Sequence, residues 1–147
     1  MLENIINRLF GKAEEINGHN RCPTYLYRWV IASSRCGKIY LHKFVGDDWS
    51  RDLHDHPKRF ISVGLFGSYV EETPSGERLY RAPWIRSFPA IHQHRIRMTR
   101  PGNTCWTIVF VGKLQREWGF WHEGKWHQWK SYVEERGGIA DKMKACE

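Results

Sequence analysis

Short runs in which apolar and polar residues alternate cover most of the chain. Alternation with a period of two is typical of β-strands that bury one face. Clusters of glycine, proline, asparagine and aspartate separate the runs at intervals of about 8–12 residues, the spacing of sandwiches and barrels. We therefore predict an all-β fold, a closed or sandwiched barrel over about residues 22–128. The predicted strands are residues 25–32, 38–45, 59–66, 68–72, 77–81, 84–88, 92–98, 104–111 and 117–121.

Both ends of the chain show helical patterns instead. Near the start, apolar residues recur at helical spacing, namely Leu2, Ile5, Ile6, Leu9 and Phe10. This spacing predicts an amphipathic helix within about residues 2–16, which ends at Gly11 or continues to Ile16. A second helix is expected over residues 129–136, within a C-terminal helix and tail of about residues 129–147. We treat residues 1–147 as a single domain, because 41% of them are apolar and can form one core.

The basic residues do not form the patch that a nucleic-acid surface requires. The formal net charge is +7, but the arginines are interleaved with apolar positions, as on the outer face of strands. A small molecule is therefore a more favoured partner than a nucleic acid. The tryptophan-rich stretch of residues 118–129 is expected in a core or an interface rather than as a stacking platform.

No stretch is long and apolar enough to cross a membrane, which would need about 18 apolar residues. Residues 1–10 lack the pattern of a secretory signal. The cysteines contain no C-x-x-C pair, and we expect reduced thiols at Cys22, Cys36, Cys105 and Cys146. These features predict a soluble cytoplasmic protein without a membrane partner.

Two histidine pairs have the spacing of a metal site. His54 and His56 are followed, about forty residues later, by His92 and His94. Imidazoles at every second strand position point to one face, and neutral imidazole is the commonest metal ligand among side chains. If the two strands meet inside a barrel, these rings form a metal centre. The remaining histidines are expected at the surface or an interface: His19, His42, His122 and His127.

The residues around these pairs resemble the cupin superfamily. The resemblance to its two metal-binding motifs lies in Gly46, Leu53-His54-Asp55-His56-Pro57, Gly67, Pro89 and His94. More narrowly, residues 65–71, Cys105-Trp106-Thr107 and Trp118-Gly119-Phe120 resemble small uncharacterised cupin-like proteins of bacteriophage and bacteria. The resemblance implies a double-stranded β-helix, a jelly-roll barrel with short terminal helices. It also implies a metal bound by His54, His56 and His94.

One departure from the family pattern changes the expected chemistry. Phe60 stands where the glutamate ligand of the family is usual, so the resemblance implies three histidines without a carboxylate. A neutral ligand set leaves a divalent ion its full charge. Cupins of this kind resemble the thiol dioxygenases, which implies Fe2+ as the native metal and Zn2+ or Ni2+ as occupants after purification. His92 is a fourth ligand, a residue that supports the ligands, or a substrate contact.

Strand phase indicates which residues line the pocket. If His54 and His56 point inward and this phase continues past Pro57, then Phe60, Ser62 and Gly64 share their face. The predicted substrate contacts are Ser62, Arg95 and Trp106, with Arg97 as a further arginine that could face inward. Asp52 and Asp55 are expected to orient the ligand imidazoles through their second ring nitrogens.

Different classes of function fit these residues. The first is a mononuclear non-haem iron oxidoreductase of the three-histidine dioxygenase type that acts on a small polar molecule. Here His92 or Tyr69 assists proton transfer as the catalytic residue, and an inward arginine positions the substrate. The second is a non-catalytic module for a sugar, nucleotide or nucleic acid. A cupin isomerase or epimerase is a third, by analogy of fold. We also expect a homodimer, because many cupins pair through edge strands.

Overall fold

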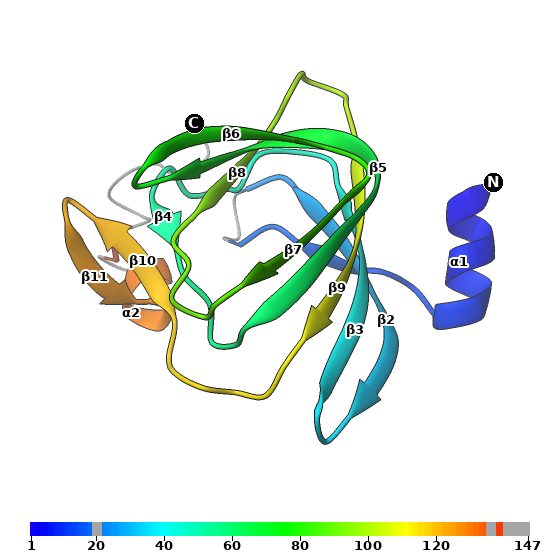
Figure 1. Ribbon diagram of the computed structural model, residues 1–147, viewed down its shortest axis with the longest axis horizontal. Coiled ribbons are helices and arrows are strands. Elements are labelled where there is room, and N and C mark those ends of the chain that lie inside the picture. Colours follow the sequence, from blue (N-terminus) through cyan, green and yellow to red (C-terminus); the bar gives the residue numbers. More distant parts are fainter. Residues whose placement is uncertain (19–21, 135–137, 140–147) are drawn as a thin grey trace.

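One long strand, β5 (Phe60–Thr73), joins the two halves of the main sheet. Its first half pairs with β7 (Trp84–Phe88) and β9 (Cys105–Val111). Its second half pairs with β6 (Gly76–Arg81) and β8 (Arg95–Met98). Figure 1 shows β5 curving across the barrel, so that a single strand takes part in both halves of the sheet.

The other strands complete this sheet and form a second, smaller one. The structure, a computed structural model, describes residues 1–18, 22–134 and 138–139. The main sheet continues from β9 through β3 (Gly37–Phe44), β2 (Leu26–Ser34) and β1 (Glu14–Ile16). The smaller sheet has the order β11 (Lys125–Gln128), β10 (Gly119–His122) and β4 (Leu53–His54). The predicted all-β class and its barrel are therefore confirmed.

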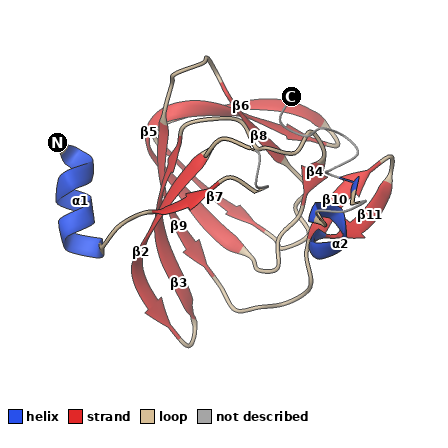
Figure 2. Ribbon diagram, turned by 180° about the vertical axis from the view of Figure 1, so that it is seen from behind, coloured by secondary structure: helices blue, strands red, loops and turns tan. Residues whose placement is uncertain are grey.

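The N-terminal helix ends at Gly11, one of its two predicted ends, and the C-terminal helix is shorter than predicted. α1 (Leu2–Phe10) ends at Gly11, whose φ of 83° breaks the helical backbone, and the residues after it form β1 instead. α2 (Trp129–Val133) covers only the start of the predicted C-terminal helix, and the rest of that prediction falls largely outside the described residues. α1 and the small sheet lie on opposite sides of the barrel (Figures 1 and 2). Within the described ranges, neither helix is long and apolar enough to span a membrane.

A glycine lets β5 change partners without ending. Gly67 has a φ of 82°, and a Cβ there would lie 2.0 Å from the carbonyl oxygen of Thr104. Only glycine tolerates both the left-handed backbone and this close approach. The pairing with β9 shifts register between Gly64 and Phe66. The two strands predicted at residues 59–66 and 68–72 are consequently one bent strand.

Buried side chains form separate clusters on the two faces of the main sheet. The inner cluster consists of Leu26, Phe44, Tyr69, Tyr80, Ile96 and Cys105. On the outer face, Ile6 of α1 packs with Trp29 and Leu41, and the Trp29 indole donates a hydrogen bond to Asn7 Oδ1 at 2.8 Å. Trp29 also stacks on Trp106, with ring centroids 5.7 Å apart. α1 therefore covers an aromatic patch on the outside of the barrel.

The tryptophan-rich segment forms a third cluster, in agreement with its predicted place in a core. Phe120 and Tyr132 are buried and stack with ring centroids 4.0 Å apart. Trp49, Trp118 and Trp129 pack against them. This cluster joins α2 to β10 and closes the barrel next to β4.

The cysteines differ in part from expectation. Cys36 is an exposed free thiol and Cys105 a buried one, but Cys22 is disulfide-bonded. The prediction of reduced thiols is therefore wrong for Cys22. Because disulfides are rare in a reducing cytosol, this bond does not support the predicted cytoplasmic location.

Asp55 lies between His54 and His56 and anchors the small sheet. Its side chain is 1% exposed. It accepts hydrogen bonds from the Gly119 backbone N–H at 2.8 Å and from the Trp126 indole at 3.0 Å. Arg116 Nη1 lies 2.8 Å from its second oxygen. The β10–β11 hairpin thus depends on one buried carboxylate.

We expect Asp55→Ala to lower the free energy of unfolding by about 3–5 kcal/mol, because it leaves buried donors and a partly buried guanidinium without an acceptor. Urea unfolding followed by tryptophan fluorescence measures the loss. Glu77→Ala is the control, since it removes an exposed carboxylate and should cost less than about 0.5 kcal/mol. Equal losses in the two variants would contradict the role of Asp55.

Candidate metal centre

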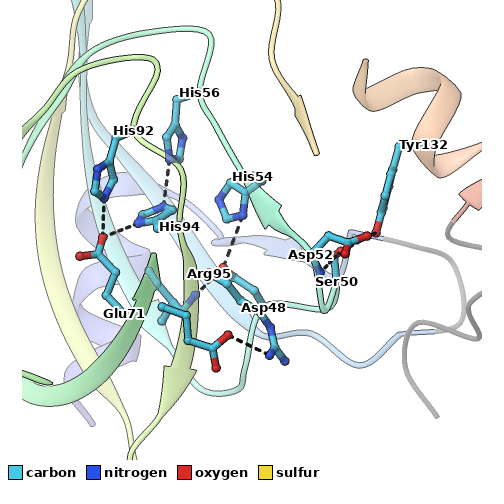
Figure 3. Close-up of polar contacts among 12 residues, drawn as sticks. Asp48, Ser50, Asp52, His54, His56, Glu71, His92, His94, Arg95 and Tyr132 are labelled. Atoms are coloured by element: carbon cyan, nitrogen blue, oxygen red, sulfur yellow. Dashed lines mark hydrogen bonds and ion pairs between the residues drawn. The ribbon is translucent and has the colours of Figure 1, made fainter. Parts of the chain in front are cut away.

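The two histidine motifs meet through their backbones. His54, the last residue of β4, donates its N–H to the carbonyl of His94 at 2.9 Å, and His94 donates back to His54 at 2.9 Å. His94 lies just before β8, so the strand predicted from residue 92 begins only at residue 95. Figure 3 shows the rings of His54, His56 and His94 converging. Sequence spacing therefore identified three residues that the fold brings together.

The three imidazoles have a geometry that suits one metal ion. Their candidate ligand atoms all lie within 4.8 Å of one another. The Nε2 atoms of His56 and His94 are 2.9 Å apart. Two nitrogens that bind one ion at about 2.0–2.1 Å lie roughly 2.8–3.4 Å apart, for right-angle or tetrahedral arrangements. The donor set fits a divalent ion with only a small adjustment of these rings.

A glutamate that the sequence analysis missed holds two of the four histidines. Glu71 Oε1 is 2.6 Å from His94 Nδ1 and 2.8 Å from His92 Nε2. If His94 donates its Nδ1 proton to this carboxylate, its Nε2 is left with a lone pair directed at His56. Burial alone would raise the pKa of Glu71, but the hydrogen bonds from His92 and His94 lower it to about 2. Glu71 is therefore ionised at neutral pH.

The three-histidine group contains no carboxylate, as expected, but Glu71 places one directly behind His94. Phe60 does occupy the usual glutamate position, and its ring packs 4.7 Å from that of His56. The carboxylate comes instead from the second half of β5, beyond the bend at Gly67. A second group of candidate ligands, made by Glu71, His92 and His94, lies next to the first. The signal in the sequence was the alternation of Gly67, Tyr69 and Glu71, which places Glu71 on the inner face.

Asp48, rather than Asp52 or Asp55, supports His54. Asp48 Oδ2 lies 3.7 Å from His54 Nδ1 and accepts a hydrogen bond from the Ile96 N–H at 2.8 Å. Burial raises the pKa of Asp48 to about 6. Asp52 instead contacts His122 at 2.8 Å and Tyr132 at 2.6 Å. Asp55 points away from the rings because it lies between two inward-facing strand positions.

The three histidines open into a cavity of about 480 Å³. Phe60 and Ser62 line it as the strand phase predicted, Tyr69 lines it too, and Gly64 does not. Gly64 is backed by the Trp84 ring, which fills the space beside it. A larger open groove of about 740 Å³ elsewhere on the surface is lined by no histidine, cysteine or carboxylate. The histidine-lined cavity is therefore the candidate functional site.

Several predicted site residues lie away from this cavity. Arg95 contacts Glu72 at 3.4 Å, and Arg97 pairs with Glu72 and Glu77. Trp106 faces the outer side of the sheet against Trp29. These contacts do not bring Arg95, Arg97 or Trp106 to the histidines.

Of the two remaining histidines of interest, His92 has one of its three predicted positions and His42 differs from expectation. His92 does not line the cavity; it contacts Glu71, which contacts the cavity residue His94. His42, expected at the surface or an interface, does line the cavity. It lies on β3 in the same phase as Phe44, which is buried in the inner cluster. The signal in the sequence was that His42, although polar, shares the inward strand phase of Phe44.

Burial keeps His42, His54 and His56 neutral. It lowers the pKa of His54 and of His56 well below the ordinary value, and the charge of a neighbouring His94 would lower both further. Burial, assisted by Arg28, lowers the pKa of His42 to about 3. A neutral imidazole offers the lone pair that a metal ion or a hydrogen-bond donor requires.

Solved structures with the same architecture identify the fold as that of the cupins, a double-stranded β-helix. The polyketide cyclase RemF from Streptomyces resistomycificus has a TM-score of 0.57 and 16% identity, over 69% of this chain and 72% of that one. A cupin-superfamily sugar phosphate isomerase from Silicibacter pomeroyi has a TM-score of 0.55 and 13% identity, over 65% of each chain. A double-stranded β-helix protein from Klebsiella pneumoniae has a TM-score of 0.54 and 12% identity, over 74% and 90%.

At these identities the likeness concerns the fold alone. No protein-family model matches the sequence, and no curated protein matches it. The chemistry of the site must therefore be argued from the residues of this chain.

His42→Phe should make the stability of the protein less sensitive to acid. Because the folded-state pKa of His42 is about 3 against an ordinary 6.5, the unfolded chain alone binds this proton between those values. The free energy of unfolding therefore falls as pH drops from 6.5 towards 3, by up to about 1.4 kcal/mol per pH unit for this residue.

Denaturant unfolding of both proteins between about pH 7 and pH 4.5 measures this difference. His54 and His56 are present in both proteins, so their contributions cancel. Parallel stability curves for the native protein and His42→Phe would contradict the prediction.

Proposed function

We propose that the protein is a metal-dependent enzyme of the cupin fold, in which His54, His56 and His94 hold one divalent ion. The reaction we favour is an oxidation of the dioxygenase type on a small molecule, with Fe2+ as the working metal. The observation that carries the proposal is the convergence of three imidazoles on one cavity. When bound, the ion would supply Lewis acidity and open coordination positions.

The residues around the histidines have roles that follow from their contacts. Glu71 fixes the His94 ring by accepting from Nδ1, and it accepts from His92 at the same oxygen. His92 can therefore exchange a proton with Glu71 without entering the cavity. Tyr69 lines the cavity, and burial raises its pKa well above the ordinary value. Its hydroxyl stays protonated and can donate a hydrogen bond to a bound substrate.

The Glu71 contacts also favour a second candidate, acid–base catalysis without redox chemistry, as in an isomerase. Imidazoles held by an ionised carboxylate, as His92 and His94 are held by Glu71, can take up and return a proton. This alternative differs from the first in one measurable respect. Proton transfer by Glu71 and His92 requires neither dioxygen nor a redox-active metal.

Protein produced with iron and purified without chelator should contain about one metal ion per chain. His54→Ala, His56→Ala and His94→Ala should each lose it, because two imidazoles bind an ion much more weakly than three. Glu71→Gln should weaken the affinity about 10- to 100-fold, since His94 loses its orienting carboxylate. Elemental analysis and competition with a chromophoric chelator measure these changes.

His122→Ala is the matched control, because His122 contacts Asp52 and lies outside the candidate ligand groups. It should keep its metal. Full retention of metal in all three ligand variants would overturn the site. Substrate-dependent dioxygen uptake by the iron form, tested over a panel of small thiols and phenols, supports the dioxygenase. Turnover that persists without dioxygen and after metal removal supports acid–base catalysis instead.

A further inference from the structure

A second polar group lines the histidine cavity on the strands β2, β3 and β9. Arg28, His42 and Thr107 are directly opposite one another across these strands, since Arg28 pairs with His42 and His42 with Thr107. All three line the cavity. Side chains at such cross-strand positions are near neighbours. They form a polar row within a wall that is otherwise largely aromatic and aliphatic.

Two atoms in this row are buried and unpaired. Within the described part of the chain, His42 Nε2 and Thr107 Oγ1 have no hydrogen-bond partner. Thr107 is only 1% exposed. Buried polar atoms are normally paired, and leaving one unpaired is unfavourable. A wall that keeps two of them on neighbouring strands is suited to a ligand group that pairs with both.

The surroundings indicate which group this is. Burial and the nearby Arg28 lower the pKa of His42 to about 3, so its imidazole is neutral and can both donate and accept. The Arg28 guanidinium is already bonded to Glu14 Oε2, at 3.0 and 2.8 Å. Its positive charge is therefore offset, and the row presents no free cation to a carboxylate or a phosphate.

Aromatic rings flank the row. The His42 ring lies 5.7 Å from that of Tyr40 and 5.9 Å from that of Phe44. Phe60, Phe88 and other aromatic residues line the same cavity. Flat apolar surfaces of this kind pack well against a ring. The enclosed volume of about 480 Å³ suits a small molecule.

We propose that His42 and Thr107 form a recognition subsite that binds an uncharged hydroxyl or amide group of an aromatic ring compound. This inference deepens the proposed function and rests on it in one respect, that the cavity is where the substrate binds. It narrows the substrate class from small polar molecules to ring compounds with a neutral hydrogen-bonding group. The metal-binding histidines are not part of the subsite.

The test compares two probes of nearly equal shape, para-fluorophenol and para-fluorotoluene, by fluorine NMR titration of the purified protein. Thr107→Val and His42→Phe each remove hydrogen-bonding atoms and keep much of the side-chain volume. Each should weaken phenol binding about three- to tenfold, the effect of one neutral hydrogen bond. Toluene binding should stay unchanged or tighten. Thr104→Val, just before β9 and outside the cavity lining, should change neither affinity.

Thermal unfolding of each variant ensures that only folded protein is compared, and Thr107→Val provides the test if His42→Phe does not fold. Unchanged phenol affinity in the folded variants would overturn the subsite. Tighter binding of para-fluorobenzoate than of the phenol, lost in Thr107→Val, would also overturn it, because the group bound would then be an anion.

Repeating the titrations in His54→Ala separates this subsite from the metal centre. Persistence of the Thr107→Val effect in that background supports the subsite and excludes coordination of the phenol as its cause. Disappearance of the effect there would overturn it. Metal content measured on the same samples reports on the proposed function independently, so each proposal can fail without the other.

Discussion

The two backbone hydrogen bonds between His54 and His94 are the constraint on which the site depends. They join the first histidine motif to the second at 2.9 Å in both directions, while the other edge of β4 pairs with β10. Asp55, between the two inward histidines, is tied to that hairpin. The direction of each imidazole is thus set by backbone pairing, which costs no reorganisation when a ligand arrives.

The carboxylate at the site lies further along β5 than the position where a glutamate ligand is usual. The sequence places an aromatic residue, Phe60, where a glutamate ligand is usual, and its ring packs on His56. Because β5 continues through the bend at Gly67, it returns Glu71 to the same interior from the far side. There the carboxylate contacts the imidazole N–H of His94. Its negative charge therefore reaches the site through a ligand ring rather than as a direct ligand of the histidine triad.

The sequence predicted the elements and the meeting of the histidines better than it predicted the lining of the cavity. Strand alternation correctly directed His94 inward, and the same alternation directs Arg95 outward. Trp106 likewise faces away because the residues on either side of it face in. Glu71 and His42 were not predicted as site residues. Their positions depend on the continuity of β5 and on the pairing of β3 with β9, which involve residues far apart in the sequence. Local pattern specifies which residues share a face, but only the assembled sheet specifies what that face meets.

The charges around the site favour a cation over protons. Burial lowers the pKa of His54 and of His56, so protons compete weakly for their lone pairs. Glu71 remains ionised, since its hydrogen bonds to His92 and His94 lower its pKa to about 2. A cation among the imidazoles would gain from that negative charge without losing a coordination position to it. An arrangement of neutral ligands backed by a carboxylate thus combines affinity for a divalent ion with open positions at the ion, and it does so beside a cavity with its own neutral polar contacts.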